Sequence, residues 1–310
     1  NNNTCWLWDS DTPHIENLKH QRENCRHLPG LKIPDDLTPI PSLESLAGKQ
    51  LIPLICVPSA AFRTCLRTLS VAGISTASGI CWATKGLDAS SGGLLHQVVE
   101  EELGSQSAMA VISGPSFAIE VARGLPTAIT VASTNSEFSN LLCHALHTST
   151  FRPYASQDIV GVELGGAVKN VLAVAAGISD GLGLGANART GMITRGLHEL
   201  MGLGLALGGH PETFTGLSGM GDLILTATDD TSRNRQLGLA LGRGESVGET
   251  VSRIGQAVES VRTSSEVISL AKQVNVQLPI CEQVYQVIHQ DKPPLEAVKT
   301  LLERPLTTEN

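Results

Sequence analysis

The sequence predicts two domains: a doubly wound α/β sheet, followed by an all-helical domain. Before about residue 155, short runs rich in β-branched and aromatic residues alternate with amphipathic stretches. After about residue 157 the β-branched clusters disappear and long helical patterns follow one another. Alternation of strands and helices is typical of a parallel sheet covered by helices on both faces. We therefore assign residues 1–156 to the sheet domain and residues 157–310 to the helical domain.

The sheet domain has six candidate strands, at 4–8, 51–57, 79–84, 109–113, 127–133 and 150–154. Ligands of doubly wound sheets bind beyond the carboxyl ends of the strands. The informative turns are therefore three that follow candidate strands, at 57–59, 83–86 and 113–118. Lys85 is a candidate anion ligand in the second turn, with a plain surface lysine as the alternative. Ser59 and Ser116 in the other turns have a simpler interpretation as helix caps.

The helical domain has six long patterns, at 157–178, 187–208, 232–242, 259–273, 280–289 and 294–303. The first of them contains a single lysine, Lys169, in an apolar stretch of small residues. If this stretch is a helix, no residue three or four positions from Lys169 is an anion. Lys169 therefore either extends to water or has a partner elsewhere in the sequence or in a ligand.

A second polar stretch lies at 216–238. Asp222 follows a glycine-rich turn there, and Ser232, Arg233 and Asn234 stand at a probable helix start. Free N–H groups at a helix start suit a phosphate, with Arg233 as its charged fork, whereas the alternative is a capped helix with solvated arginines. Together with Lys169 these residues describe a small polar site. A desolvated lysine with a lowered pKa can donate a proton to a carbonyl oxygen in such a site.

Composition limits the function. A chain of 310 residues is long enough for two ordinary domains, and its net charge of −8 argues against general nucleic-acid binding while allowing a local cationic pocket. The seven cysteines are scattered and lack metal-ligand spacing, so neither a disulfide framework nor a zinc site is expected. No apolar stretch is expected to span a membrane, and the first residues do not form a signal peptide. We therefore expect a soluble, cytoplasmic protein that is not inserted in a membrane.

From about residue 50 to 285 the chain resembles the bacterial NAD(P)-dependent glycerol-3-phosphate dehydrogenase family. The resemblance is carried by "WATKGL", "VISGPSFAIEVARGLPTAITVAS", "GVELGGAVKNVLAVAAGISDGLGLGANART" and "GMGDLILTATDDTSRNRQLGLALGRG". It implies a Rossmann-like sheet domain and reversible hydride transfer between NAD(P)H and dihydroxyacetone phosphate. The product would be sn-glycerol 3-phosphate for phospholipid synthesis. The resemblance also implies a homodimer.

The resemblance implies a role for individual residues. Lys169 matches the family's catalytic proton donor and acceptor. Substrate-binding positions of the family match Lys85, Gly114, Ser116, Asp222, Ser232, Arg233 and Asn234. Positions that contact NAD or NADP match Ser10, Lys85, Ala118, Arg233, Ala257 and Glu259. Asn170 and Thr226 match polar partners of the site, and no metal is implied.

The chain departs from the family near its first residues. The family opens with a β-strand and a GxGxxG loop that holds the cofactor pyrophosphate at a helix start. Here the first glycine is Gly30, and 4–8 resembles the family's second strand, so we expect the first βα unit to be missing. We expect the absent strand between the strands at 4–8 and 51–57, leaving both exposed. The GxGxxA patterns at 181–188 follow a run of helical length and do not replace the loop.

Two questions stay open at this point. Ser10 stands where the family often has a basic residue for the 2′-phosphate of NADP, so the choice between NAD and NADP is undecided. The competing functions are a related two-domain dehydrogenase of another hydroxy acid, and a truncated, non-catalytic chain that folds or dimerises without cofactor. The first competitor has no need of a phosphate. A requirement for Arg233 in binding would therefore favour glycerol-3-phosphate dehydrogenase over the dehydrogenase of another hydroxy acid.

Overall fold

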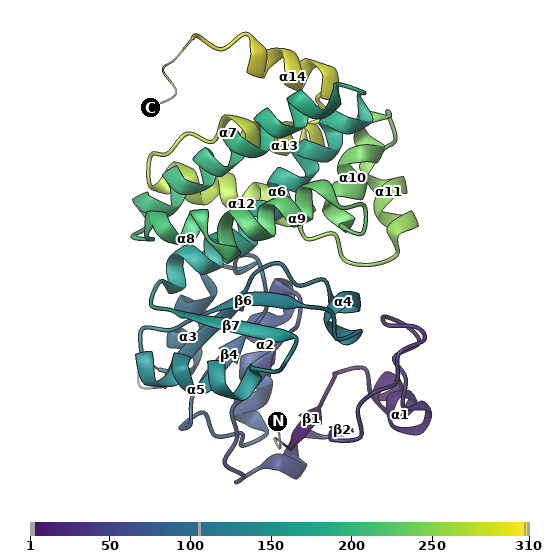
Figure 1. Cartoon of the computed structure of the whole chain (residues 1–310), viewed down its shortest axis with the longest axis vertical. Coiled ribbons are helices and arrows are strands. Elements are labelled where there is room, and N and C mark those ends of the chain that lie inside the picture. The colour runs from purple at the N-terminus through teal and green to yellow at the C-terminus, as the bar shows by residue number, and fades with distance from the viewer. Residues whose placement is uncertain (1–3, 105–106, 307, 309–310) are drawn as a thin grey trace.

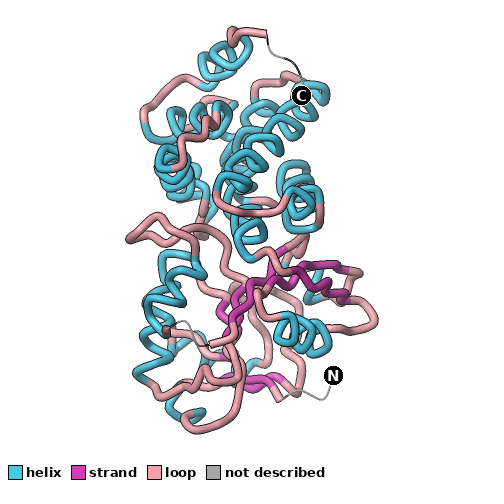
Figure 2. The backbone as a smooth tube through the Cα atoms, turned by 90° about the vertical axis from the view of Figure 1, so that its left-hand side faces the viewer, coloured by secondary structure: helices cyan, strands magenta, loops and turns pink. Residues whose placement is uncertain are grey.

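The computed structural model describes residues 4–104, 107–306 and 308. A sheet domain and a helical domain are stacked along the long axis of the molecule (Figure 1). The main sheet has five strands in sequence order: β3 (Leu54–Ile55), β4 (Ile80–Trp82), β5 (Met109–Ser113), β6 (Thr127–Ala132) and β7 (Phe151–Ser156). Helices flank these strands on either side (Figure 2). The expected doubly wound α/β domain followed by helices is confirmed.

The sheet is mixed rather than wholly parallel. β6 runs antiparallel to β5, whereas β3–β4, β4–β5 and β6–β7 are parallel pairs. A parallel crossover needs a connection long enough to return along the sheet, usually through a full helix. Between β5 and β6 the chain forms only the five-residue helix α4 (Ala118–Ala122). The short connection therefore explains the reversed direction.

A separate two-stranded sheet lies beside the main one. β1 (Cys5–Leu7) pairs in parallel with β2 (Leu37–Pro39), and helix α1 (Thr12–Gln21) connects them. β2 was not predicted, because three residues that end in proline give almost no strand signal. Among the described strands β1 pairs only with β2, and β3 only with β4. Both are thus edge strands, and Leu54 of β3 is 47% exposed.

Three further helices and a short 3-10 helix complete the sheet domain. They are α2 (Ser59–Val71), α3 (Leu95–Leu103), α5 (Ser136–Leu146) and the 3-10 turn Leu43–Leu46. Phe62 of α2 packs edge-on against Trp82 of β4 with ring centroids 5.9 Å apart. Both rings are completely buried, so the end of β4, and the turn after it, rest on a rigid core.

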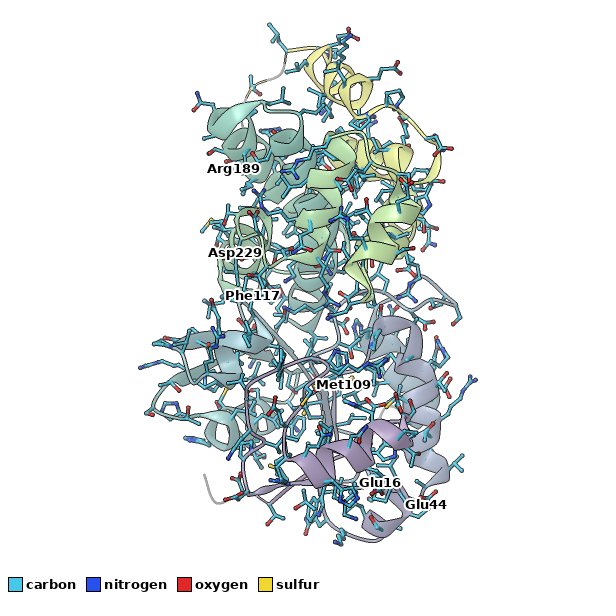
Figure 3. All side chains as sticks on the ribbon, turned by 90° about the vertical axis from the view of Figure 1, so that its right-hand side faces the viewer. Glu16, Glu44, Met109, Phe117, Arg189 and Asp229 are labelled. Carbon is cyan, nitrogen blue, oxygen red and sulfur yellow. The ribbon has the colours of Figure 1, made fainter. Side chains whose placement is uncertain are left out.

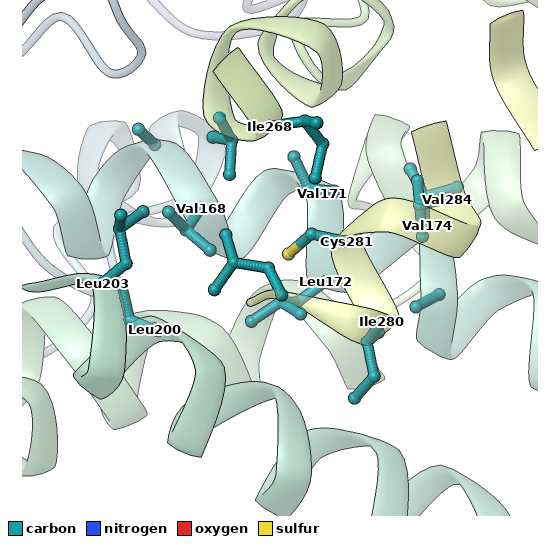
Figure 4. Packing of buried hydrophobic residues seen from close by; sticks show 14 of the residues in the cluster. Val168, Val171, Leu172, Val174, Leu200, Leu203, Ile268, Ile280, Cys281 and Val284 are labelled. Carbon is teal, nitrogen blue, oxygen red and sulfur yellow. The ribbon is translucent and has the colours of Figure 1, made fainter. Parts of the chain in front are cut away.

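The helical domain is built around one central helix, α6 (Ile159–Gly181). The other elements are α7 (Gly185–Ala206), α8 (Pro211–Thr215), a π-helical turn (Leu217–Gly221), α9 (Asp222–Thr228), α10 (Arg233–Gly242), α11 (Val247–Ile254), α12 (Ser260–Gln273), α13 (Pro279–His289) and α14 (Pro294–Leu302). Figure 4 shows Val168 and Leu172 of α6 between Leu200 of α7, Ile268 of α12 and Cys281 of α13. The sequence did not predict α8, α9 or α11, which are short and interrupted by polar residues.

One expectation about α6 is wrong. At 23 residues it is long and apolar enough to cross a membrane, although the sequence was expected to hold no such stretch. Of its most apolar window 94% is buried inside the protein. A helix that is apolar on every face is buried by other helices in the core of a globular protein. α6 is therefore the core helix of the domain.

Candidate active site

Helix α6 brings Lys169 to the boundary between the two domains. The helix is capped by Asp158, whose side chain accepts a hydrogen bond from the Gly161 N–H at 2.7 Å. One turn before Lys169, a Cβ on Gly165 would lie 3.0 Å from the Ser218 carbonyl carbon and closer still to its oxygen. Glycine at this position therefore lets the π-helical turn before Asp222 lie directly on α6.

Asp222 is the partner that Lys169 lacks in its own helix. Lys169 Nζ lies 2.6 Å from Asp222 Oδ1 and 3.0 Å from Thr226 Oγ1. Lys169 is 6% exposed and Asp222 is 1% exposed, so the ion pair is shielded from water. The Thr226 hydroxyl donates to the Asp222 carbonyl oxygen at 2.6 Å and thereby turns a lone pair toward the ammonium group. The prediction of a distant partner for Lys169 is confirmed.

Lys85 binds the other oxygen of the same carboxylate. Its Nζ lies 2.6 Å from Asp222 Oδ2 and 3.2 Å from the Gly114 carbonyl oxygen. The turn after β4 has this shape because Gly86 adopts φ +122°, which favours glycine. The stem of Lys85 then crosses Gly166 of α6, where a Cβ would lie 3.3 Å from Lys85 Cγ. The sheet domain thus contributes a second cation to the site.

Two ammonium groups on one buried carboxylate perturb its electrostatics. Burial alone would raise the pKa of Asp222, but the charges of Lys85 and Lys169 outweigh it and lower the pKa. For Lys169, burial and then the like charge of Lys85 lower the pKa to about 8, against the attraction of Asp222. A lysine whose pKa lies near neutrality exchanges protons readily at physiological pH.

A chain of side-chain amides lies beside Lys169. Asn170 Nδ2 donates to Glu259 Oε2 at 2.9 Å, and Asn170 Oδ1 accepts from Asn234 Nδ2 at 2.9 Å. Asn234 Oδ1 in turn accepts from the Ser260 N–H at 3.2 Å. Burial raises the pKa of Glu259. The chain fixes the orientation of both amides and joins α6, α10 and the start of α12.

The start of α10 combines a cap with an exposed charge. Ser232 Oγ accepts from the Arg235 N–H at 3.3 Å, so the alternative of a capped helix is correct for the cap. Its solvated arginines are correct for Arg233 and wrong for Arg235, which is 6% exposed. Arg233 is exposed, and its Nη1 donates to Gln256 Oε1 at 3.3 Å. Gln256 was not predicted as a site residue, and its place next to Ala257 in "GQAVES" was the available signal. The helix start thus combines a capped first turn with the exposed guanidinium of Arg233.

The remaining predicted residues lie around this centre. Ser116 Oγ donates to the Gly114 carbonyl oxygen at 3.0 Å, and α4 is capped by Phe117, so Ser116 is not the cap of that helix. Figure 3 places Phe117 where the two domains meet. Ser59 is likewise not a cap, since it is the first residue of α2 after the N-cap Pro58, and its hydroxyl accepts from Arg262 of α12.

The positions predicted to contact the cofactor fall into two regions. Ala118 and Ala257 are exposed, and Ala257 lies two residues before Glu259. Ser10 lies after β1, where it lines a surface cavity with Trp8 and Thr68. Within the described part of the chain, no hydrogen bond or ion pair joins Ser10 to the lysine–aspartate centre. In the stretch 181–188, Gly181 ends α6, Gly183 lies in the turn and Gly185 begins α7, so the pattern follows a helix and not a strand.

Fold and site define a class of protein. A sheet of the dinucleotide-binding type is joined to a helical domain, and a buried lysine–aspartate pair lies where the domains meet. This is the architecture of a two-domain dehydrogenase.

Comparisons with known proteins identify the family. The model "NAD-dependent glycerol-3-phosphate dehydrogenase N-terminus" matches residues 1–139, and its C-terminal counterpart matches residues 158–299. A glycerol-3-phosphate dehydrogenase (NAD(P)+) of Halorhodospira halophila is 51% identical over 298 residues, 96% of this chain and 89% of the relative. One of Alkalilimnicola ehrlichii is 54% identical over 299 residues, 96% of this chain and 90% of the relative. The chain belongs to the NAD-dependent glycerol-3-phosphate dehydrogenase family.

A solved structure agrees with these relatives. The crystal structure of glycerol-3-phosphate dehydrogenase from Coxiella burnetii superposes with a TM-score of 0.92 at 45% sequence identity. The match covers 96% of this chain and 91% of that one. The similarity therefore extends over both domains.

Proposed function

We propose that this chain catalyses reversible hydride transfer between NAD(P)H and dihydroxyacetone phosphate, giving sn-glycerol 3-phosphate for glycerophospholipid synthesis. The observation that carries the proposal is the buried Lys169, with its Nζ 2.6 Å from Asp222 Oδ1 and a pKa lowered to about 8. Reduction of a ketone requires a proton for the carbonyl oxygen as the hydride arrives at carbon. Lys169 supplies this proton in one direction and accepts it in the other.

Lys85 and Asp222 set the pKa and the position of the catalytic lysine, Lys169. Asp222 fixes the position of the Lys169 ammonium, while Lys85 favours its neutral form by charge repulsion. The Lys85 side chain is 20% exposed, against 7% for Lys169, so Lys85 is the more accessible of the two cations to a ligand. We expect it to contact the substrate oxygen together with the turn at Gly114 and Ser116.

The start of α10 is the proposed phosphate site. Arg233 is the exposed guanidinium there, and Ser232 and Asn234 flank it. A guanidinium matches two oxygens of a phosphate, and the helix dipole adds a favourable partial charge. This phosphate contact separates the proposal from a dehydrogenase of an unphosphorylated hydroxy acid, which is the alternative function.

The residues at the carboxyl end of β5 fit a dinucleotide. The Ser113 hydroxyl is buried without a hydrogen-bond partner in the described structure, and Gly114 beside it adopts φ +144°. When bound, NADH or NADPH would supply the hydride for reduction, and NAD+ or NADP+ would accept it in the reverse direction. Ala118, Ala257 and Glu259 are the positions proposed to contact it. Ser10 carries no positive charge for a 2′-phosphate, so binding of both cofactors needs to be measured.

We propose further that a parallel strand with a glycine-rich loop completes the sheet between β1 and β3. Both are edge strands, and β1 already pairs in parallel with β2 in the smaller sheet. A loop after such a strand would place its N–H groups where doubly wound sheets hold a pyrophosphate. If supplying this βα unit leaves the affinity for NADH unchanged, the pyrophosphate of the cofactor must be bound elsewhere.

The test of the function is oxidation of NADH or NADPH that depends on dihydroxyacetone phosphate. Lys169→Ala is expected to lower kcat by about 100- to 10,000-fold, the usual contribution of a general acid, without unfolding the protein. Lys272→Ala, which removes an exposed lysine from α12, is the control. Near-normal turnover of Lys169→Ala would remove the assigned role. Loss of phosphate-dependent binding in Arg233→Ala would count against the alternative dehydrogenase.

Three other expectations stay predictions. They are the domain boundary at 156/157, a homodimer and a cytoplasmic location. Light scattering of the purified chain measures its mass in solution and tests the dimer.

A further inference from the structure

Arg235 is a buried arginine that the proposed chemistry does not use. It lies in the first turn of α10, two residues after the exposed Arg233, and is 6% exposed. Its guanidinium contacts Asp180 Oδ2 at 2.7 Å, Asp230 Oδ1 at 2.8 Å and the Ala227 carbonyl oxygen at 3.0 Å. The pKa of Arg235 is raised, because these carboxylates outweigh the effect of burial.

The three partners of Arg235 belong to the elements that carry the site. Asp180 lies near the end of α6, the helix of Lys169, and Ala227 lies in α9, the helix of Asp222. Asp230 lies in the short connection between α9 and α10. One side chain therefore links the start of α10 to both helices of the proton-transfer pair.

We propose that Arg235 is a positioning residue that sets the place of the phosphate-binding start of α10 relative to the Lys169–Asp222 pair. This inference rests on the proposed function. The middle of α10 is already fixed against α6, because a Cβ on Gly238 would lie 2.9 Å from Gly177 Cα. The Arg235 carbonyl group also lies against Gly177 of α6. Ahead of that contact, the first turn is held by the Asn234–Asn170 hydrogen bond and by the Arg235 side chain. Arg235 restrains this turn, and Arg233 extends from it toward the ligand.

The shape of the guanidinium is required. Its three partners lie on different elements, and a planar fork reaches several acceptors at once, whereas an ammonium group on a flexible stem does not hold the same geometry. Arg235→Lys keeps the charge opposite Asp180 and Asp230 but loses part of the clamp. The expected result is a site that still transfers protons and holds phosphate poorly.

The experiment compares a phosphorylated and an unphosphorylated substrate. For Arg235→Lys, kcat/KM with dihydroxyacetone phosphate is expected to fall about tenfold, while kcat/KM with dihydroxyacetone stays within about twofold of wild type. Arg189→Lys is the matched control, since Arg189 of α7 also pairs with Asp180, at 2.9 Å, but forms no hydrogen bond or ion pair with α9 or α10 in the described part of the chain. Figure 3 shows Arg189 farther from the domain junction than Asp229.

Two results would overturn the inference. One is unchanged kcat/KM with the phosphorylated substrate in Arg235→Lys; the other is an equal loss with both substrates, which indicates general loosening of the fold. If Arg235→Lys does not fold, Asp230→Ala serves instead, because the Asp230 side chain is 77% exposed. It is expected to show a smaller selective loss, about threefold, and the absence of any selective loss overturns the inference.

Calorimetric binding of glycerol 3-phosphate separates this inference from the proposed function, because it requires no turnover. A wild-type chain that binds glycerol 3-phosphate yet never reduces dihydroxyacetone phosphate refutes the function alone. In that case weaker binding by Arg235→Lys than by Arg189→Lys still supports the clamp, and equal binding refutes it. A wild-type chain that binds no glycerol 3-phosphate refutes both.

Discussion

Gly238→Ala tests whether close contact of α6 and α10 maintains the site. An added Cβ would lie 2.9 Å from both Gly177 Cα and the Ile178 nitrogen, and closer still to the Val174 carbonyl oxygen. Ordinary contacts of this kind begin at 3.4 Å, so α10 must retreat by at least about 0.5 Å from α6. The contact is with backbone atoms, which have no other rotamer to adopt. Overpacking of this kind costs about 1–3 kcal/mol.

The measurement is the free energy of unfolding in urea, followed by the KM for dihydroxyacetone phosphate. Gly191→Ala is the matched control, because Gly191 lies inside α7 with no atom within 4 Å of its added Cβ. That control is expected to gain up to about 1 kcal/mol from helix propensity alone. Gly238→Ala should lose stability and raise KM. If it is as stable as Gly191→Ala, the two helices have room to separate and the packing argument is wrong.

Three other substitutions test the buried charges. Burial raises the pKa of Glu199 to about 7. The protonated form therefore stabilises the fold below pH 4.5, and this stability, about 3 kcal/mol, is lost as the pH rises to about 7. Urea unfolding of Glu199→Gln at several pH values should lack this change. Lys85→Met removes the like charge beside Lys169 and should raise the pKa of Lys169. The pH at which reduction declines and glycerol 3-phosphate oxidation increases should then move above about 8. An unchanged pH profile would contradict the effect of the Lys85 charge on Lys169. Asp222→Asn leaves two ammonium groups without their carboxylate, so the free energy of unfolding in urea should fall by about 3–5 kcal/mol at pH 7. The loss should be smaller at pH 9, where Lys169 is neutral. A loss of stability that is independent of pH would argue against charge as the cause.

The periodicity of the sequence predicts the long elements well. The pattern at 157–178 corresponds to α6, and that at 187–208 to α7, within a few residues at each end. Both are long enough for their apolar residues to signal a helix without knowledge of their neighbours. The strand at 51–57 shrinks to two residues, because the proline and the exposed edge of β3 leave most of it unpaired.

Other features depend on tertiary packing and leave no local signal. The reversal of β6 follows from the length of the α4 connection. The π-helical turn before Asp222 forms where Gly165 of α6 admits the Ser218 carbonyl group. Arg235 resembles the neighbouring Arg233 in sequence, yet one is buried between carboxylates and the other is exposed. Propensity cannot tell them apart, since the difference arises from the position of Asp180 in another helix.

The placement of Lys169 shows how the two domains act as one site. Its anion is 53 residues away in sequence, and the second cation on that anion is 137 residues from it, in the other domain. Separating the domains would remove Lys85 from Asp222, and the pKa of Lys169 would then rise, because the like charge that lowers it would be gone. The lysine is therefore poised for proton transfer only while the domains are in contact.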